Sequence, residues 1–272
     1  MGKFDGILIV SDLDGTLLDN RSRIAEKNRK AIAYFESEGG RFSYISGRVA
    51  RCLKPIFAMM CPNIPVGANN GMLYDVTREE WVDFEPMKPE VVTLANDILA
   101  RFPEAGLVVM GKRHVYFSKK DPIGDRFRDI VGLSERYDPI ESIPEDYCKI
   151  LFTYPAERFD ELRQAVDAHP LAKEFELVRS DARYYEVMPK GCNKGRALLR
   201  LAKYLGIDPE RTIAVGDNEN DMSMFRAAKI GIAVANASEM AKSAADLVLD
   251  VTNEDGAIAN IIERLDRGEE IL

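Results

Sequence analysis

The stretch ILIVSDLDGTLLD, residues 7–19, decides the fold of this chain. Its first four residues form an apolar run typical of a buried strand in a parallel sheet, and Asp12 and Asp14 follow closely after it. Open α/β sheets bind their ligands at the carboxyl ends of such strands. Carboxylates two positions apart lie on the same side of an extended chain and repel each other unless a cation neutralises them. We therefore expect a divalent metal ion at the end of this strand.

Three later segments place polar residues at the ends of predicted elements. Residues 41–45 form a β-rich run that ends at Ser46, Gly47 and Arg48, residues 212–215 lead into GDNEND at 216–221, and Lys194 opens a predicted helix. Alone, the DxD pair fits a solvated acidic turn, Ser46 a strand-end turn and Lys194 a solvated helix face. Their occurrence together in one chain favours a catalytic site.

DxDGTL, the strand-end serine, the helix-start lysine and GDNxND follow the order of the four motifs of the haloacid dehalogenase (HAD) superfamily, which this sequence resembles. Further matches make it similar to the Cof-type phosphatases with a type IIB cap. These matches are Asn70-Gly71, Glu186-Val187-Met188-Pro189 ahead of Lys194-Gly195, and the segments 231–237 and 253–257. Between the two ends of the chain, only the pattern of strands and helices matches.

The resemblance implies a catalytic role for four residues. Asp12 is the expected nucleophile, which forms an aspartyl-phosphate and so divides one difficult displacement into two easier ones. Asp14 is the expected general acid for the leaving oxygen and then the general base for water. Ser46 is expected to donate a hydrogen bond to a phosphoryl oxygen, and Lys194 to supply positive charge beside the carboxylates. Lys190 competes for that role, but Lys194 occupies the Lys-Gly position of the family.

The resemblance also implies a bound Mg²⁺ and several phosphate contacts. Asp12, the backbone carbonyl of Asp14 and Asp217 are the expected metal ligands, with Asp221 in the same group orienting water or ligands. The further candidates for phosphate contacts are Gly47, Arg48 and Asn220. Arg48 either contacts substrate or pairs with an acidic neighbour. Residues 218–221 also resemble a helix N-cap, and Asn70-Gly71 is first of all a turn signal that could in addition line the site.

The predicted elements describe an α/β protein in two parts. Strands and helices alternate over residues 7–60 and again over residues 193–266, which predicts a Rossmann-like, doubly wound parallel sheet. The intervening order αββαβαββ is typical of an antiparallel sheet covered on one face by helices. We therefore predict a discontinuous core, 1–85 with 186–272, and an inserted α+β cap domain, 86–185.

The cap is expected to select the leaving group of the substrate. His114 and Arg183 are the first candidates for contacts with it, among polar residues near the ends of the predicted cap strands that also include Tyr116, Arg179, Tyr184 and Tyr185. The alternative is that these side chains pack across strands or face solvent.

Composition excludes several classes of partner. A net charge of −8 and a pI near 5.1 argue against a surface that binds nucleic acid. No apolar run is long enough for a signal peptide or membrane span, so we expect a cytoplasmic protein with no membrane partner. Four cysteines without a CxxC pair, and only two histidines, argue for reduced thiols rather than a zinc site. We expect a monomer or weak homodimer.

Together these features predict a Mg²⁺-dependent phosphomonoester hydrolase acting on small phosphorylated metabolites, with sugar phosphates the first class to test. A phosphomutase of the same superfamily is the first alternative, and it would form an isomer rather than release phosphate. The second alternative is a phosphorylation-controlled signalling or binding protein, which would accept phosphate without rapid multiple turnover.

Overall fold

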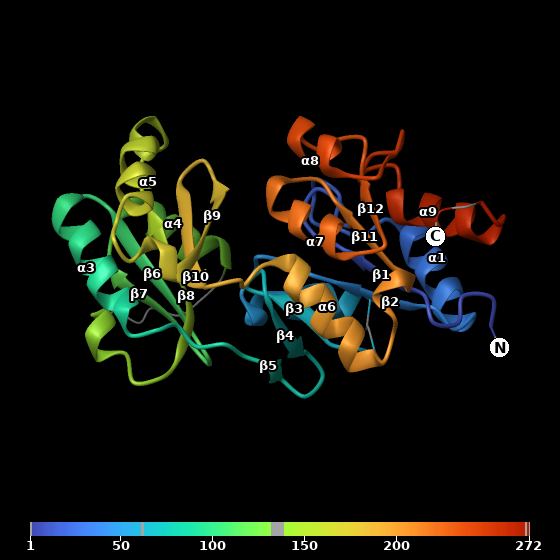
Figure 1. Cartoon of the computed structure of the whole chain (residues 1–272), viewed down its shortest axis with the longest axis horizontal. Helices are drawn as coiled ribbons and strands as arrows, with labels where there is room; N and C mark the ends of the chain where they lie inside the picture. The colour runs from blue at the N-terminus through green and yellow to red at the C-terminus, as the bar shows by residue number, and fades with distance from the viewer. Residues whose placement is uncertain (1, 61–62, 132–138, 270, 272) are drawn as a thin grey trace. The chain divides into compact units, whose positions relative to one another are not determined.

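The apolar run that opens the sequence forms strand β1 (Leu8–Ser11), and every residue of this strand is buried. The computed structural model describes residues 2–60, 63–131, 139–269 and 271. Strand β1 pairs in parallel with β11 (Thr212–Gly216) on one side and with β2 (Arg41–Tyr44) on the other. The five-stranded sheet has the order β13-β12-β11-β1-β2, which confirms the predicted parallel α/β sheet (Figure 1).

Helices cover this sheet on both faces, as a parallel sheet requires. Figure 1 shows α1 and α9 on one face and α6 and α7 on the other. The remaining strands are β12 (Ile230–Ala233) and β13 (Leu247–Val248). The helices of this unit are α1 (Glu26–Ser37), α2 (Lys54–Met60), α6 (Lys194–Leu205), α7 (Met222–Ala227), α8 (Glu239–Ala244) and α9 (Ala257–Asp266).

A small antiparallel sheet of order β3-β4-β5 follows α2. Strands β4 (Met72–Asp75) and β5 (Glu80–Asp83) form an antiparallel hairpin, and β3 (Val66–Ala68), the short strand before Asn70-Gly71, pairs with β4. Strand β3 is short and contains Gly67, so it carries little strand signal. A Cβ at Gly67 would lie 2.5 Å from Ile45 Cγ1, which explains the need for glycine where the chain crosses the end of β2.

The second unit contains a five-stranded antiparallel sheet of order β7-β6-β8-β10-β9. Its strands are β6 (Gly106–Gly111), β7 (Val115–Lys119), β8 (Tyr147–Thr153), β9 (Phe175–Asp181) and β10 (Tyr184–Pro189). Its helices are α3 (Glu90–Arg101), α4 (Pro122–Val131) and α5 (Phe159–Asp167). Leu94 of α3, Leu162 of α5 and Ile150 of β8 share one buried apolar cluster, so α3 and α5 cover the same sheet.

The boundary between the two units differs from the predicted one. Contacts divide the chain into Met1–Asp83 with Asn193–Leu272, and Phe84–Cys192. The predicted end of the insertion at residue 185 would cut β10, which stays paired with β9 as far as Pro189, opposite Phe175. Since a strand cannot be divided without breaking its ladder, the second unit extends through β10 to Cys192.

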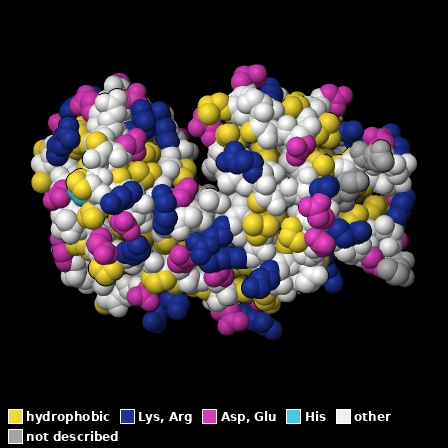
Figure 2. All heavy atoms as spheres, viewed as in Figure 1, with side chains coloured by type: hydrophobic (Ala, Val, Ile, Leu, Met, Phe, Trp, Pro, Cys, Tyr) yellow, Lys and Arg dark blue, Asp and Glu magenta, His cyan; other side chains and the backbone are white. Residues whose placement is uncertain are grey.

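The surface of the chain carries charges of both signs. Figure 2 shows acidic and basic side chains interspersed on the visible face. The chain as a whole has a net charge of −8. Among the described residues, no helix combines the length and the apolar character needed to cross a membrane. Cys148 and Cys192 are buried and Cys52 is half-buried, whereas Cys61 lies outside the described residues.

Candidate active site at the carboxyl edge of the parallel sheet

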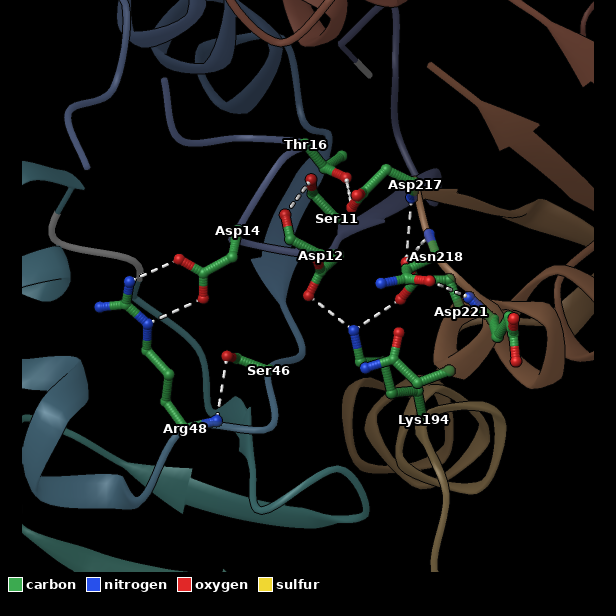
Figure 3. Close-up of polar contacts among 12 residues, drawn as sticks. Ser11, Asp12, Asp14, Thr16, Ser46, Arg48, Lys194, Asp217, Asn218 and Asp221 are labelled. Atoms are coloured by element: carbon green, nitrogen blue, oxygen red, sulfur yellow. Dashed lines mark hydrogen bonds and ion pairs between the residues drawn. The ribbon is translucent and has the colours of Figure 1, made fainter. Parts of the chain in front are cut away.

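Polar residues from neighbouring strands meet where the parallel strands end. Asp12 follows β1, Ser46 follows β2 and Asp217 follows β11, and because these strands are adjacent and parallel, their ends lie at one edge of the sheet (Figure 3). The backbone N–H of Asp12 donates to Val215 O at 2.8 Å, which ties the first carboxylate to the end of β11.

Lys194 brings its ammonium group to this edge from the first turn of α6. Its side chain is 1% exposed, and Nζ donates to Asp12 Oδ1 at 2.6 Å and to Asp221 Oδ1 at 2.5 Å. Asn193 caps the helix by accepting from the Arg196 N–H at 3.0 Å. A cation at a helix N-terminus is repelled by the positive end of the helix dipole. The negative charges of Asp12 and Asp221 offset this repulsion for Lys194. Burial alone would lower the pKa of Lys194, but its attraction to Asp12 and Asp221 outweighs burial and raises it.

Three aspartates form a cluster that could hold a metal ion. Asp12, Asp217 and Asp221 each offer a carboxylate oxygen within 4.8 Å of the others. Burial raises the pKa of Asp12 well above its usual value. The positive charge of Lys194 lowers this pKa, whereas the negative charges of Asp221 and Asp217 raise it further. Burial and the charge of Asp221 raise the pKa of Asp217 to about 6. A hard divalent cation fits this all-oxygen donor set and would favour the ionised forms.

The two oxygens of Asp221 are already engaged by the protein. Oδ1 accepts from Lys194, and Oδ2 accepts from the backbone N–H groups of Asp217 and Asn218, both at 3.0 Å. The Asn218 side chain and Asp221 together form a capping box, so the predicted helix N-cap is confirmed. Asp221 therefore orients Lys194 and the loop that carries Asp217, whereas Asp12 and Asp217 keep oxygens for a cation.

The turn after β1 holds Asp217 in place. Thr16 Oγ1 donates to Asp217 Oδ1 at 2.8 Å. Gly15 has a φ of +81°, and a Cβ at this position would lie 2.6 Å from Asp217 Oδ2. Only glycine satisfies both the left-handed backbone and the close approach.

Two asparagines that the sequence analysis gave no role brace the same turn. Asn236 Nδ2 donates to Gly15 O at 2.8 Å, and its Oδ1 accepts from the Asn253 N–H at 2.9 Å. Asn253 Nδ2 in turn donates to Leu18 O at 2.9 Å. Both residues lie in segments quoted above for the resemblance, 231–237 and 253–257, which was the available signal for them.

Arg48 and Asp14 form a bidentate ion pair beside the cluster. Arg48 Nε lies 2.9 Å from Asp14 Oδ2, and Nη2 lies 2.5 Å from Oδ1. Figure 3 shows the Asp14 side chain turned toward Arg48 and away from Lys194. Of the two alternatives for Arg48, an acidic partner is the one present here. The backbone N–H of Arg48 also donates to Ser46 Oγ at 3.1 Å.

The remaining residues predicted to contact phosphate or the leaving group lie partly in the first unit and partly in the second. Asn220 Oδ1 is buried and has no hydrogen-bond partner among the described residues. A Cβ at Gly47 would lie 3.1 Å from Asn70 Oδ1, so these two residues are close neighbours. In the second unit, His114 Nδ1 lies 3.1 Å from Glu145 Oε1, and Arg183 pairs with Asp181 and lies over the Tyr184 ring. Lys190 Nζ donates to Phe175 O at 3.3 Å within the second unit.

Fold and site together define a hydrolase of the HAD class, and sequence comparison agrees. Residues 9–262 match the haloacid dehalogenase-like hydrolase family. The chain therefore belongs to that family. It is 30% identical to the phosphatase YwpJ of Bacillus subtilis, over 95% of this chain and 99% of that protein. It is 26% identical to the 5-amino-6-(5-phospho-D-ribitylamino)uracil phosphatase YcsE of the same organism, over 92% of each chain.

Solved structures share the fold. A haloacid dehalogenase-like hydrolase from Bacteroides thetaiotaomicron superposes with a TM-score of 0.82 at 26% identity, over 95% of this chain and 99% of that one. The subclass IIB sugar phosphatase BT4131 has the same fold, with a TM-score of 0.80 at 19% identity, over 96% and 99% of the two chains. The predicted kinship with the phosphatases of the HAD superfamily is confirmed, and the chain is a hydrolase of that superfamily.

Proposed function

We propose that this phosphatase hydrolyses phosphate monoesters of small metabolites, sugar phosphates first among them, through a phosphorylated Asp12 and with bound Mg²⁺. The observation that carries the proposal is the convergence of the Asp12 carboxylate, the Lys194 ammonium and the Asp217 carboxylate at the ends of β1 and β11. Phosphoryl transfer requires an aligned nucleophile, a proton donor and positive charge around the equatorial oxygens.

Asp12 is the proposed nucleophile. Its carboxylate is buried at the end of β1, and the contact with Lys194 fixes its orientation. The Asp12 oxygen attacks phosphorus as the bond to the ester oxygen breaks, which gives an aspartyl-phosphate and the free alcohol. Lys194, Ser46 and Asn220 contact the phosphoryl oxygens in this proposal, with Gly47 in the same turn as Ser46. The hydroxyl of Ser46 is open to donate to a phosphoryl oxygen, and the Nδ2 group of Asn220 is the part of that side chain that could do the same.

Asp14 is the proposed acid and base. It gives its proton to the departing ester oxygen, and the resulting carboxylate then takes a proton from the water that attacks phosphorus. That attack releases inorganic phosphate and regenerates Asp12. The position of Asp14 two residues after Asp12 supports this assignment, since both residues belong to the same strand-end turn.

Asp12, Asp217 and the backbone carbonyl of Asp14 would hold the Mg²⁺, with Asp221 orienting them. When bound, the cation neutralises charge on the carboxylates and phosphoryl oxygens. The all-oxygen donor set and the elevated pKa values of Asp12 and Asp217 support a site built for a hard cation.

The first unit is proposed to be the catalytic core and the second unit the cap that selects the leaving group. His114 and Arg183 remain the proposed cap contacts. His114 is 44% exposed and Arg183 is 32% exposed, so both side chains retain surface for a ligand in spite of their carboxylate partners.

A steady-state screen of phosphate release tests the proposal. The panel contains sugar phosphates, nucleotides, flavin mononucleotide, pyridoxal phosphate and, because of the name of the relative YcsE, a phosphorylated ribitylamino compound. We expect multiple turnovers in Mg²⁺ with at least one member and none for Asp12→Asn. Conversion of a sugar phosphate to its isomer without phosphate release would favour a phosphomutase, and a single stable phosphorylation without turnover would favour a signalling role.

A further inference from the structure

Arg48 binds the carboxylate of Asp14, which the proposed reaction needs as its general acid and base. Both carboxylate oxygens of Asp14 accept from the guanidinium of Arg48, so in this arrangement Asp14 is held away from the Asp12–Lys194 cluster (Figure 3). We propose that Arg48 exchanges Asp14 for the phosphoryl group of the substrate, so that Asp14 is released for proton transfer only when phosphate is bound. This inference rests on the proposed function.

The pair is placed so that it can open at low cost. The Asp14 side chain is 56% exposed and that of Arg48 is 29% exposed. Water can solvate the exposed Asp14 carboxylate once the pair separates, so the pair opens at low cost provided that Arg48 gains another anion. Within the described ranges, the Asp14 carboxylate accepts hydrogen bonds from Arg48 alone. Loss of Arg48 is therefore sufficient to free the Asp14 side chain to rotate.

A phosphoryl group is a suitable replacement partner. The planar guanidinium fork binds phosphate oxygens in the same bidentate way as a carboxylate, and phosphate carries the larger charge. Ser46 Oγ accepts from the Arg48 N–H, while its hydroxyl hydrogen has no acceptor in the part of the chain that the structure describes. Figure 3 shows Ser46 between the Asp14–Arg48 pair and Lys194. A phosphoryl oxygen bound to Ser46 therefore brings its charge next to Arg48.

The exchange would couple substrate recognition to acid–base chemistry. While the phosphoryl group is on the ester or on Asp12, Arg48 is engaged by its oxygens and Asp14 is free. When inorganic phosphate leaves, Arg48 returns to Asp14. The rival arrangement is a static pair, in which Arg48 stays on Asp14 and orients it throughout the reaction.

A double-mutant cycle on phosphate binding separates these two arrangements. The measurement is the Kd of inorganic phosphate in Mg²⁺, by titration calorimetry, for the parent, Arg48→Ala, Asp14→Asn and the double variant. Under exchange, Arg48→Ala weakens phosphate binding by about tenfold or more, as expected for loss of a charge-assisted bidentate contact. Asp14→Asn tightens binding because it removes the competitor for the guanidinium. That tightening is largely lost in the Arg48→Ala background.

A static pair gives a different pattern. Phosphate binding then changes little in Arg48→Ala, and Asp14→Asn has the same effect with and without Arg48. Lys54→Ala is the matched control, because it removes one positive charge whose partner is Glu79 rather than Asp14, and its phosphate Kd should stay that of the parent. Equal phosphate binding by the parent and Arg48→Ala would overturn the exchange.

Leaving-group dependence supplies the second measurement. Under exchange, Arg48→Ala lowers kcat/KM by the same factor for an alkyl phosphate and an activated aryl phosphate, mainly through KM, and Arg48→Lys restores part of the loss. A loss confined to the alkyl phosphate would show that Arg48 acts through Asp14 and would contradict exchange. If the parent neither binds nor releases phosphate, the proposed function fails together with the inference, whereas phosphate release with an unaffected Arg48→Ala variant rejects the inference alone.

Discussion

Lys194 Nζ lies 2.6 Å from Asp12 Oδ1, although 182 positions separate the two residues in the sequence. The same ammonium group lies 2.5 Å from Asp221 Oδ1, and all three side chains are buried. The core of the site is therefore a buried cation shared by two buried anions. In such a group, each charge is tolerated only because its partners are present.

Replacement of Lys194 by the apolar Lys194→Met should lower both stability and activity. Two buried carboxylates would lose their compensating charge, which costs about 3–5 kcal/mol of unfolding free energy. Denaturant titration gives the stability, and phosphate release gives kcat/KM. Adding Asp221→Asn should restore part of the stability but none of the activity. A Lys194→Met variant as stable as Lys190→Ala would contradict the coupling between these charges.

Replacement of the nucleophile should separate stability from activity. Asp12→Asn keeps the shape of the side chain but removes most of its nucleophilicity, so turnover should fall by about a thousandfold or more. Lys194 loses one of its two anionic partners but keeps Asp221, and burial disfavours the charged form of Asp12, so we expect these effects to offset and the thermal midpoint in the absence of metal to change little. A folded variant with near-normal turnover would remove Asp12 from the chemistry.

The sequence was sufficient to predict the parallel sheet because its strands carry strong local signals. Residues 7–10 and 213–215 are apolar, and these runs lie in or next to β1 and within β11. The predicted end of the second unit at residue 185 lies inside β10, because the Glu186–Pro189 segment quoted for the resemblance is part of that strand.

Contacts within the site depend on tertiary structure and could not be predicted in full. The order of motifs indicated which residues belong to the site, but a pattern does not tell which partner a flexible arginine chooses. The Arg48–Asp14 pair and the contacts of Asn236 and Asn253 with the turn after β1 join residues that are distant in the sequence. Asp221 is a further example. The sequence predicted that it lies near the metal ligands, but not that both of its carboxylate oxygens accept hydrogen bonds from the protein.

Stabilisation by Mg²⁺ should depend on pH through Asp217. Its folded pKa of about 6, in the absence of metal, exceeds the ordinary value of 3.8, so the folded protein holds a proton between these values that the unfolded chain releases. Without metal, this contribution to stability is present below about pH 4 and is lost as the pH rises through about 6. Metal binds the ionised form and should reverse the trend.

The measurement is the shift in Tm at a fixed Mg²⁺ concentration, from about pH 5 to about pH 8. The shift should be small at the acidic end and grow as the pH passes about 6. Asp217→Asn should abolish most of it, while Asp250→Asn, in the segment after β13, serves as a control for the charge change. A shift of constant size across this range would argue against Asp217 as a ligand.

Gly15→Ala should damage the metal site as well as the fold. The positive φ of Gly15 costs about 1–2 kcal/mol for a residue with a Cβ, and the new methyl group would lie 2.6 Å from Asp217 Oδ2. Gly206→Ala is the matched control, since this glycine also has a positive φ but no atom within 4 Å of an added Cβ. Both variants should lose stability, but only Gly15→Ala should require more Mg²⁺ for half-maximal activity. Equal metal requirements would show that the close contact with Asp217 is relieved without consequence.

Cap substitutions should change specificity, whereas core substitutions should affect all substrates alike. The proposed core machinery contacts the phosphoryl end that every substrate shares, and the second unit contacts the part that differs. His114→Ala and Arg183→Ala should therefore lower kcat/KM more for a sugar phosphate than for a small aryl phosphate, which offers few groups for the cap to contact. Lys194→Ala is the comparison that should lower both.

The useful quantity is the ratio of the two kcat/KM values, because it cancels general losses of folded enzyme. Loss of one hydrogen bond to a neutral hydroxyl of the sugar changes that ratio by about two- to tenfold. Glu145→Gln adds an internal test, since Glu145 accepts from the His114 ring and from Tyr116 and should alter the ratio only if His114 contacts the sugar. If the ratio stayed constant for all three cap variants, specificity would have to lie in the core unit, and the division of labour between the two units would be wrong.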